Sequence, residues 1–158
     1  MVEIFSGSVT IKNTRSGGQN PNVLGAEYDG SGNFNPVLSV NGDGLKYYVW
    51  NIVPTIPGFL NVSPSYIQMT GNGGKIYNLG VAVQASGSLC VMNEVGRTPA
   101  GTVFDQWYFP YPTRLLLAYN LIDEGQQKFS LDAGKYPRPI IYDFNSSVEQ
   151  TWQIAQAS

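Results

Sequence analysis

Apolar and polar positions alternate over short stretches of the chain, and no stretch carries apolar residues at helical spacing over three turns. β-Branched and aromatic runs recur instead between Gly, Pro, Asn and Asp residues, which is the pattern of strands joined by turns. We therefore expect about twelve strands in an all-β protein. They span residues 8–13, 22–28, 36–40, 46–53, 66–70, 75–84, 88–95, 104–109, 114–120, 128–132, 139–144 and 151–156.

Three Trp residues repeat along the chain at intervals of roughly fifty residues. Trp50, Trp107 and Trp152 are each followed two positions later by a large apolar residue. Because residues i and i+2 share one face of a strand, each pair should point into one core. Each Trp would lie in the fourth strand of a block of four, which gives blocks of about 4–60, 61–112 and 113–158.

Three blocks of four strands predict a β-trefoil that forms a single domain over residues 1–158. In this architecture three hairpins cap a six-stranded barrel, and closure of the barrel removes exposed sheet edges. A β-sandwich is the alternative, but a sandwich requires no threefold Trp pattern.

The composition argues against an enzyme. The chain has no His, which excludes Ser-His, Cys-His and His-metal sites, and a single Cys excludes an internal disulfide. That residue, Cys90, lies in an apolar run and is expected to be an inert core thiol. The carboxylates show no spacing typical of a catalytic pair, and the Asp132-Ala-Gly segment is interpreted as a turn. We expect no catalytic residues, no metal and no cofactor.

Charge and hydropathy limit the partners. Nine basic residues, scattered over a chain of net charge −2, form no stripe for nucleic acid. No apolar run approaches the ~20 residues of a membrane helix, and the first residues do not resemble a signal peptide. We therefore expect no membrane partner and a cytoplasmic or unconventionally secreted protein. Low charge and exposed aromatic residues are compatible with a homodimer. The glycine-rich segment 71–75 lacks the spacing of a phosphate loop and predicts a hairpin turn.

Three segments resemble fungal proteins of this fold. Residues 6–13 resemble the first strand of small mushroom β-trefoil proteins, and residues 140–154 look like the end of ricin-B-like mushroom lectins. Residues 22–50 are similar to the first block of mushroom β-trefoil protease inhibitors, a group that includes mycocypins and cocaprins. The resemblance implies a β-trefoil fold and either protease inhibition or carbohydrate binding.

The first candidate site is the loop between the second and third expected strands. Its glycines let the backbone approach another surface closely, and its two aromatic residues are expected to be exposed interface anchors. In the resembled inhibitors this loop is one place where proteases are engaged, so we expect reversible insertion into the cleft of papain-like cysteine proteases. A hairpin tip without a partner is the alternative. The loop comprises Glu27, Tyr28, Asp29, Gly30, Ser31, Gly32, Asn33, Phe34 and Asn35.

A second candidate loop follows Trp50, and three prolines stiffen it. Its apolar side chains would suit an aspartic, pepsin-like protease with hydrophobic subsites, unless Phe59 or Leu60 packs into the barrel base. For a trypsin-like target, Arg97 and Arg138 are the basic loop residues that could serve, although a solvated charge is the favoured interpretation of each. The second loop comprises Thr55, Ile56, Pro57, Gly58, Phe59 and Leu60.

Carbohydrate binding is the rival function. Sugar sites combine an aromatic platform with Asp and Asn hydrogen bonds, and residues 142–145 carry this chemistry. The lectin pattern Gln-x-Trp is intact only at Gln150 and Trp152, and no Asp recurs at matched positions of the three blocks. One degenerate glycan site is compatible with these observations. A purely structural trefoil is a third reading.

Overall fold

The computed structural model describes residues 8–13, 22–55, 64–96, 104–109, 116–117, 129–145 and 147–157. These residues contain twelve strands and two short 3₁₀ turns. The strands are β1 Ser8–Asn13, β2 Asn22–Tyr28, β3 Phe34–Val40, β4 Trp50–Pro54, β5 Ser65–Thr70, β6 Ile76–Val81, β7 Cys90–Glu94, β8 Trp107–Tyr108, β9 Leu116–Leu117, β10 Phe129–Asp132, β11 Ile140–Asp143 and β12 Trp152–Gln156. The turns are η1 Asn72–Gly74 and η2 Val148–Gln150.

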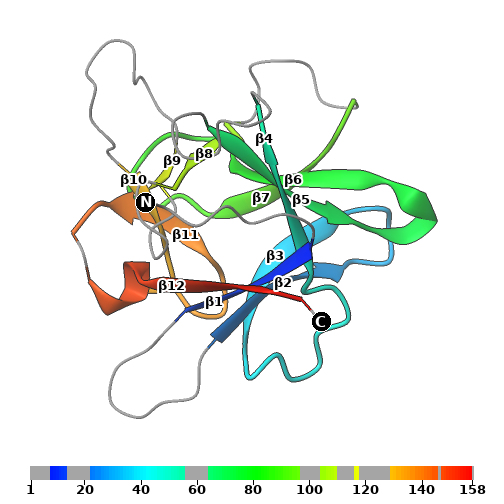
Figure 1. The fold of residues 1–158 in the computed structure, drawn as a ribbon, viewed down its shortest axis with the longest axis horizontal. Coiled ribbons are helices and arrows are strands. Elements are labelled where there is room, and N and C mark those ends of the chain that lie inside the picture. Colours follow the sequence, from blue (N-terminus) through cyan, green and yellow to red (C-terminus); the bar gives the residue numbers. More distant parts are fainter. Residues whose placement is uncertain are drawn as a thin grey trace.

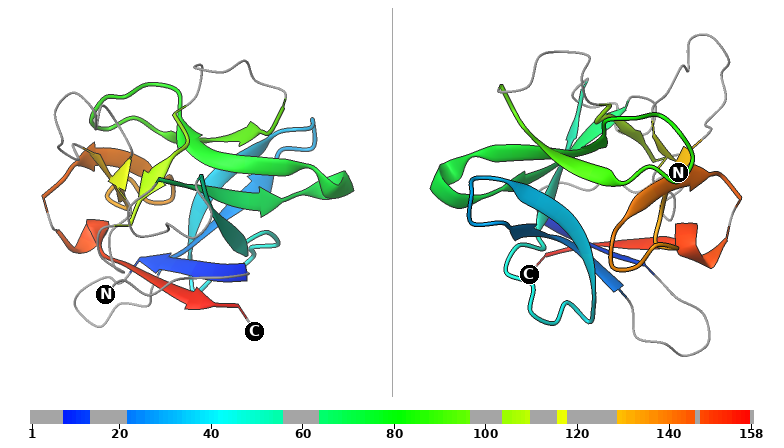
Figure 2. Two further views of the ribbon diagram at one scale, coloured as in Figure 1. Left: turned by 45° about the horizontal axis from the view of Figure 1, so that its top comes forward. Right: turned by 180° about the vertical axis from the view of Figure 1, so that it is seen from behind.

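The strand pairing is that of a barrel with three attached hairpins. Antiparallel pairs run in the order β12–β1–β4–β5–β8–β9 and form the barrel wall. The remaining strands form the hairpins β2–β3, β6–β7 and β10–β11, which can be followed by colour in Figure 2. Figure 1 shows β1, in blue, beside β12, in red, so that the two ends of the described chain meet in the barrel wall.

The same type of buried hydrogen bond occurs in each of the three blocks. The indole Nε1–H of each Trp donates to the backbone carbonyl of a leucine in the second strand of its own block. All six residues are fully buried. The bonds join Trp50 to Leu24 at 2.9 Å, Trp107 to Leu79 at 2.9 Å and Trp152 to Leu131 at 3.0 Å.

A second hydrogen bond repeats beside the first. The backbone N–H two residues after each of these leucines donates to the carbonyl three residues before the matching Trp. The donor and acceptor pairs are Ala26 and Tyr47, Val81 and Phe104, and Ala133 and Glu149, each at 2.9 Å. The pairing order and these two repeated bonds define a β-trefoil, as the Trp spacing predicted.

The core draws apolar side chains from all three blocks. Ile52, Phe109 and Ile154, two residues after the three Trp residues, are all buried, which confirms the prediction that each pair shares the core. Cys90 is also fully buried, and this burial raises the pKa of its thiol, as expected for an inert core cysteine. No helix of the described residues is long and apolar enough to cross a membrane.

Several expected strands are shorter than the sequence pattern suggested. The fourth strand begins at Trp50 instead of residue 46, because residues 41–44 form a turn and the backbone at Tyr47 makes only an isolated bridge to Ala26. The strand expected over 75–84 ends at Val81, where its pairing partner begins at Cys90. The glycine-rich segment 71–75 forms the predicted hairpin turn, and it contains η1.

Truncation of any of the three Trp residues should destabilise the barrel. We expect Trp50→Ala, Trp107→Ala and Trp152→Ala each to lower the free energy of unfolding by ~3–5 kcal/mol, measured by urea denaturation. Replacement of each Trp by Phe should cost ~1–3 kcal/mol, because a buried carbonyl loses its donor.

Val83→Ala is the control for these variants. Its side chain is 60% exposed, so its effect should stay within about 0.5 kcal/mol. A loss below about 1 kcal/mol at any of the three Trp→Ala variants would contradict a threefold core.

Candidate functional site

The first candidate loop forms the tip of the β2–β3 hairpin, and its own hydrogen bonds hold it. The Asp29 carboxylate accepts the backbone N–H of Ser31 at 2.7 Å and that of Asn33 at 3.1 Å. The N–H of Asp29 donates in turn to the Asn33 carbonyl at 2.9 Å. Gly30 and Gly32 supply the positive φ angles, 82° and 99°, that this tight turn requires. The tip is therefore ordered before it meets a partner.

The prediction that Phe34 is exposed in this loop is wrong. It was expected to be an exposed anchor, but it is 4% exposed and belongs to the hydrophobic core. Its ring lies 4.8 Å from that of Tyr47 and 4.9 Å from that of Tyr77. A Cβ on Gly71 would come within 2.7 Å of the Phe34 ring, so the β5–β6 turn approaches it closely. Phe34 anchors the hairpin to the second block and is not available to a partner.

Tyr28 is the aromatic residue that the loop does expose. It is 42% exposed, and its ring lies 5.1 Å from that of Phe34, which supports it from beneath. Glu27 and Asn35 face each other across the hairpin and are exposed. The loop thus presents one aromatic side chain beside an ordered polar tip.

Little of the second candidate loop falls within the described residues. Thr55 bonds twice to the carbonyl of Pro64, at 3.0 Å through its N–H and at 2.8 Å through its hydroxyl. Residues 56–60, and Arg97, lie outside the described residues. Arg138 is half-buried in the β10–β11 turn.

A cavity of about 260 Å³ lies in the third block. It collects polar side chains around one exposed aromatic ring, that of Tyr142, which is 45% exposed. The lining residues are Asp132, Gly134, Lys135, Ile140, Tyr142, Asn145, Ser147 and Glu149. Residues 142–145 were considered for sugar binding, and the first and last of them, Tyr142 and Asn145, line this cavity. The structure brings Asp132 and Glu149 to the same cavity.

Gln150 holds two sides of this cavity in place. It is fully buried, and its amide nitrogen donates to Asp132 Oδ2 at 3.1 Å and to the Asp143 carbonyl at 2.8 Å. Its amide oxygen accepts the backbone N–H of Asn145 at 3.0 Å. Asp132 Oδ1 accepts the N–H of Gly134 at 2.6 Å. The carboxylate and the Asn145 backbone are therefore fixed before a ligand arrives.

The cavity offers complementary hydrogen-bonding groups. Each carboxylate oxygen of Asp132 accepts one hydrogen bond, from Gly134 or from Gln150, and has a further lone pair. The side-chain oxygen of Asn145 accepts the Ser147 N–H at 2.9 Å, which leaves the amide nitrogen as a donor without a partner among the described residues. A hydroxyl group both donates and accepts, so it can bond to the carboxylate and to the amide at once.

The third block differs from the others at the position occupied by Asp132. The matching positions, next to the leucines that bind the indoles, are Gly25 and Gly80. At Gly25 a Cβ would collide with the Tyr47 carbonyl and would lie 2.9 Å from Cδ1 of Leu45. No side chain fits there, and Leu45 already occupies the space. The first block therefore lacks the carboxylate on steric grounds.

The aromatic ring is likewise particular to the third block. The strand register matches Tyr142 with Ser39 in the first block and Asn93 in the second. An aromatic residue at this position therefore occurs in the third block alone among the three matched positions. The role of Asp132 was missed in the sequence, where the segment predicted only a turn; its signal was an acidic residue where the other two blocks carry glycine.

Comparisons with known proteins support the fold alone. No protein-family model matches the chain, and no curated protein matches it. A solved structure, the crystal structure of the designed threefold-symmetric protein ThreeFoil, is similar with a TM-score of 0.64. The match covers 96% of this chain and 100% of that chain at 17% sequence identity. It agrees with the three-block architecture, while membership of the mushroom inhibitor or lectin families stays a prediction.

The order of the hairpin tip should depend on pH. The two backbone N–H bonds to Asp29 lower the pKa of its carboxyl below the ordinary 3.8. The ionised carboxylate stabilises the folded tip at pH values above the ordinary pKa. This contribution is lost as the pH falls through the lowered pKa of the folded state. We expect the amide proton shifts of Ser31 and Asn33, followed by NMR, to titrate together with a midpoint below 3.8.

The variant Asp29→Asn is the control for this titration, because it removes the titrating group and should remove the shared transition. A midpoint at or above 3.8 in the native chain would contradict the hydrogen-bonded tip.

Proposed function

We propose that this protein binds carbohydrate, without catalysing a reaction, at the cavity of the third block. The observation that carries the proposal is the carboxylate of Asp132, which Gln150 holds in a cavity that the exposed ring of Tyr142 also lines. Sugars present hydroxyl groups at their edges and C–H groups on their faces. A fixed acceptor, an amide donor with no partner among the described residues and an aromatic ring in one cavity match both features.

The size of the cavity limits the ligand. Its volume of about 260 Å³ lies just below the roughly 300–1,000 Å³ typical of sites for drug-sized ligands. This volume suits one terminal sugar residue, with the rest of a glycan extending into solvent. Lys135 and Glu149 are exposed at the rim, where they can contact such an extension.

Removal of the aromatic ring should weaken sugar binding and leave the fold intact. After a glycan array identifies the preferred terminal sugar, we expect Tyr142→Ala to raise its Kd about tenfold by calorimetry, because aromatic packing contributes up to ~1.5 kcal/mol. The matched control is Tyr28→Ala, since both tyrosines are nearly half exposed and Tyr28 lies outside the cavity. The absence of binding to any glycan, or an unchanged Kd for Tyr142→Ala, would contradict the proposal.

Protease inhibition through the residues 27–35 is the second candidate function. The observation that favours it is the hydrogen-bonded tip around Asp29, which reduces the ordering cost of insertion into a cleft. Tyr28 replaces the pair of aromatic anchors expected from the sequence, because Phe34 is buried. Papain-like cysteine proteases are the proposed targets, and aspartic proteases would bind elsewhere, at the loop that begins at Thr55.

A loop variant that keeps Phe34 should separate inhibition from folding. If this candidate holds, the double variant Tyr28→Ala, Asp29→Ala should weaken papain inhibition by about tenfold or more, the effect of losing an interface anchor. Steady-state assays with papain, pepsin and trypsin in one plate measure this, with Tyr142→Ala as the matched control. No inhibition of any of the three enzymes would contradict the candidate. Pepsin inhibition retained by the loop variant would indicate the separate second site.

A further inference from the structure

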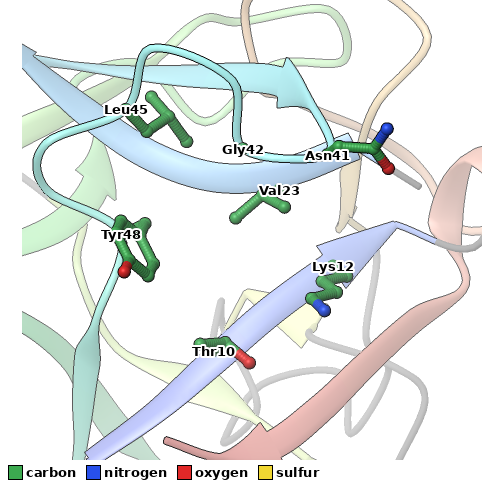
Figure 3. A pocket seen from close by; sticks show the side chains of 7 residues that line it. All are labelled: Thr10, Lys12, Val23, Asn41, Gly42, Leu45 and Tyr48. Carbon is green, nitrogen blue, oxygen red and sulfur yellow. The ribbon is translucent and has the colours of Figure 1, made fainter. Parts of the chain in front are cut away.

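A second cavity, of about 360 Å³, lies in the first block between the barrel strand β1 and the turn that joins β3 to β4. Figure 3 shows Thr10 and Lys12 along β1, with the turn and Tyr48 across from them. Among the described residues, none lines both this cavity and the cavity of the third block. The residues that line it are Thr10, Lys12, Val23, Asn41, Gly42, Leu45 and Tyr48.

The turn that walls this cavity is held by hydrogen bonds. The N–H groups of Gly42 and Asp43 donate to the carbonyls of Ser39 and Val40, and Leu45 donates to Gly42, each at 3.0 Å. The Ser39 hydroxyl closes the turn with a bond of 2.6 Å to the Asp43 carbonyl. These bonds fix the wall, so a ligand would not have to order it.

Because Gly42 has no side chain, this turn can lie close to strand β2. Asn41 and Gly42 have φ angles of 56° and 76°, and a Cβ on Gly42 would lie 3.4 Å from the side chain of Val23. Val23 is buried, and Leu45 is half-buried beside it. One side of the cavity is therefore aliphatic, and Tyr48, 43% exposed, adds a ring at its mouth.

The opposite side of the cavity carries a cation and a hydroxyl. Thr10 and Lys12 are two residues apart on β1, so their side chains share one face of the strand. Lys12 pairs across the sheet with Val23 on one side and Gln153 on the other, and it is half-buried. Within the described residues, no carboxylate forms an ion pair with the ammonium group of Lys12. The ion pair in this part of the chain joins Lys75 to Glu94, neither of which lines the cavity, at 3.3 Å.

We propose that this cavity binds a compact organic monoanion, a carboxylate attached to a small ring. The ammonium group of Lys12 and the hydroxyl of Thr10 would bind the carboxylate, and Val23, Leu45 and Tyr48 would contact the ring. A lone half-buried ammonium group matches one negative charge, whereas a phosphate monoester carries close to two charges at neutral pH. A charge-assisted bond to Lys12 would be strengthened by the partial removal of water.

Two kinds of molecule carry this chemistry, and two probes distinguish them. Glucuronate presents the carboxylate on a polar sugar ring, and cyclohexanecarboxylate presents it on an apolar ring. The aliphatic wall favours cyclohexanecarboxylate, whereas tighter binding of glucuronate would identify an acidic sugar as the ligand class. Cyclohexanecarboxamide, the neutral counterpart, tests the need for the charge.

The experiment is an NMR titration of the full chain with each probe. We expect either carboxylate to shift the amide resonances of residues 10–12 and 41–48 and to bind with one Kd. Lys12→Met should raise that Kd about tenfold or more, since a hydrogen bond to a charged group contributes roughly 1.5–3 kcal/mol. Thr10→Val should raise it by a smaller factor. The matched control is Lys46→Met, which removes an exposed lysine of the same block that does not line the cavity.

Three results would overturn the proposal: no shifts with either carboxylate, equal binding of the neutral carboxamide, or an unchanged Kd in Lys12→Met. The thermal unfolding of each variant separates a lost site from a lost fold. Because the described lining residues of the two cavities are all different, failure here leaves carbohydrate binding in the third block untouched, and the reverse also holds.

Discussion

Each block of the barrel is closed by a hydrogen bond from a buried indole to a leucine carbonyl in the second strand of the same block. A buried carbonyl without a donor costs free energy, and the Trp side chain satisfies it while filling the core. The bond thereby ties the fourth strand of a block to its second strand. Three such bonds fix the hairpins on the barrel in the same way in each block.

This constraint also explains where polar groups meet. In the third block the residue two before the Trp, Gln150, bonds to Asp132 on the second strand. In the second block the residue at that position, Asp105, accepts a bond of 3.0 Å from Asn78, also on the second strand. The scaffold thus places one polar pair beside each of these two indoles. The third-block pair lies at a cavity that the exposed ring of Tyr142 also lines, which is why we propose the ligand site there.

The sequence predicted the parts of the fold that depend on local pattern. The Trp residues and the apolar residues that follow them are buried for the reason their spacing indicated, and the bounds of β1 and β2 agree with the expected strands. The burial of Phe34 could not be predicted, because it depends on Tyr77 and on the close approach of Gly71 from another block. The role of Asp132 likewise depends on a contact with Gln150, and the turn pattern around it carries no sign of that contact.

The turn that contains Leu45 gives the first block a cavity different from that of the third block. Leu45 occupies the space beside Gly25 that a side chain would need for a site like that of the third block. The same turn, with Leu45 and Gly42, walls the cavity over Thr10 and Lys12. One local arrangement therefore excludes a polar side chain at Gly25 and provides one wall of the cationic cavity over Thr10 and Lys12. If both cavities bind ligands, the threefold barrel carries two sites of different chemistry. The third-block site takes a carboxylate from the position after the buried leucine, whereas the first-block site takes an ammonium group from β1.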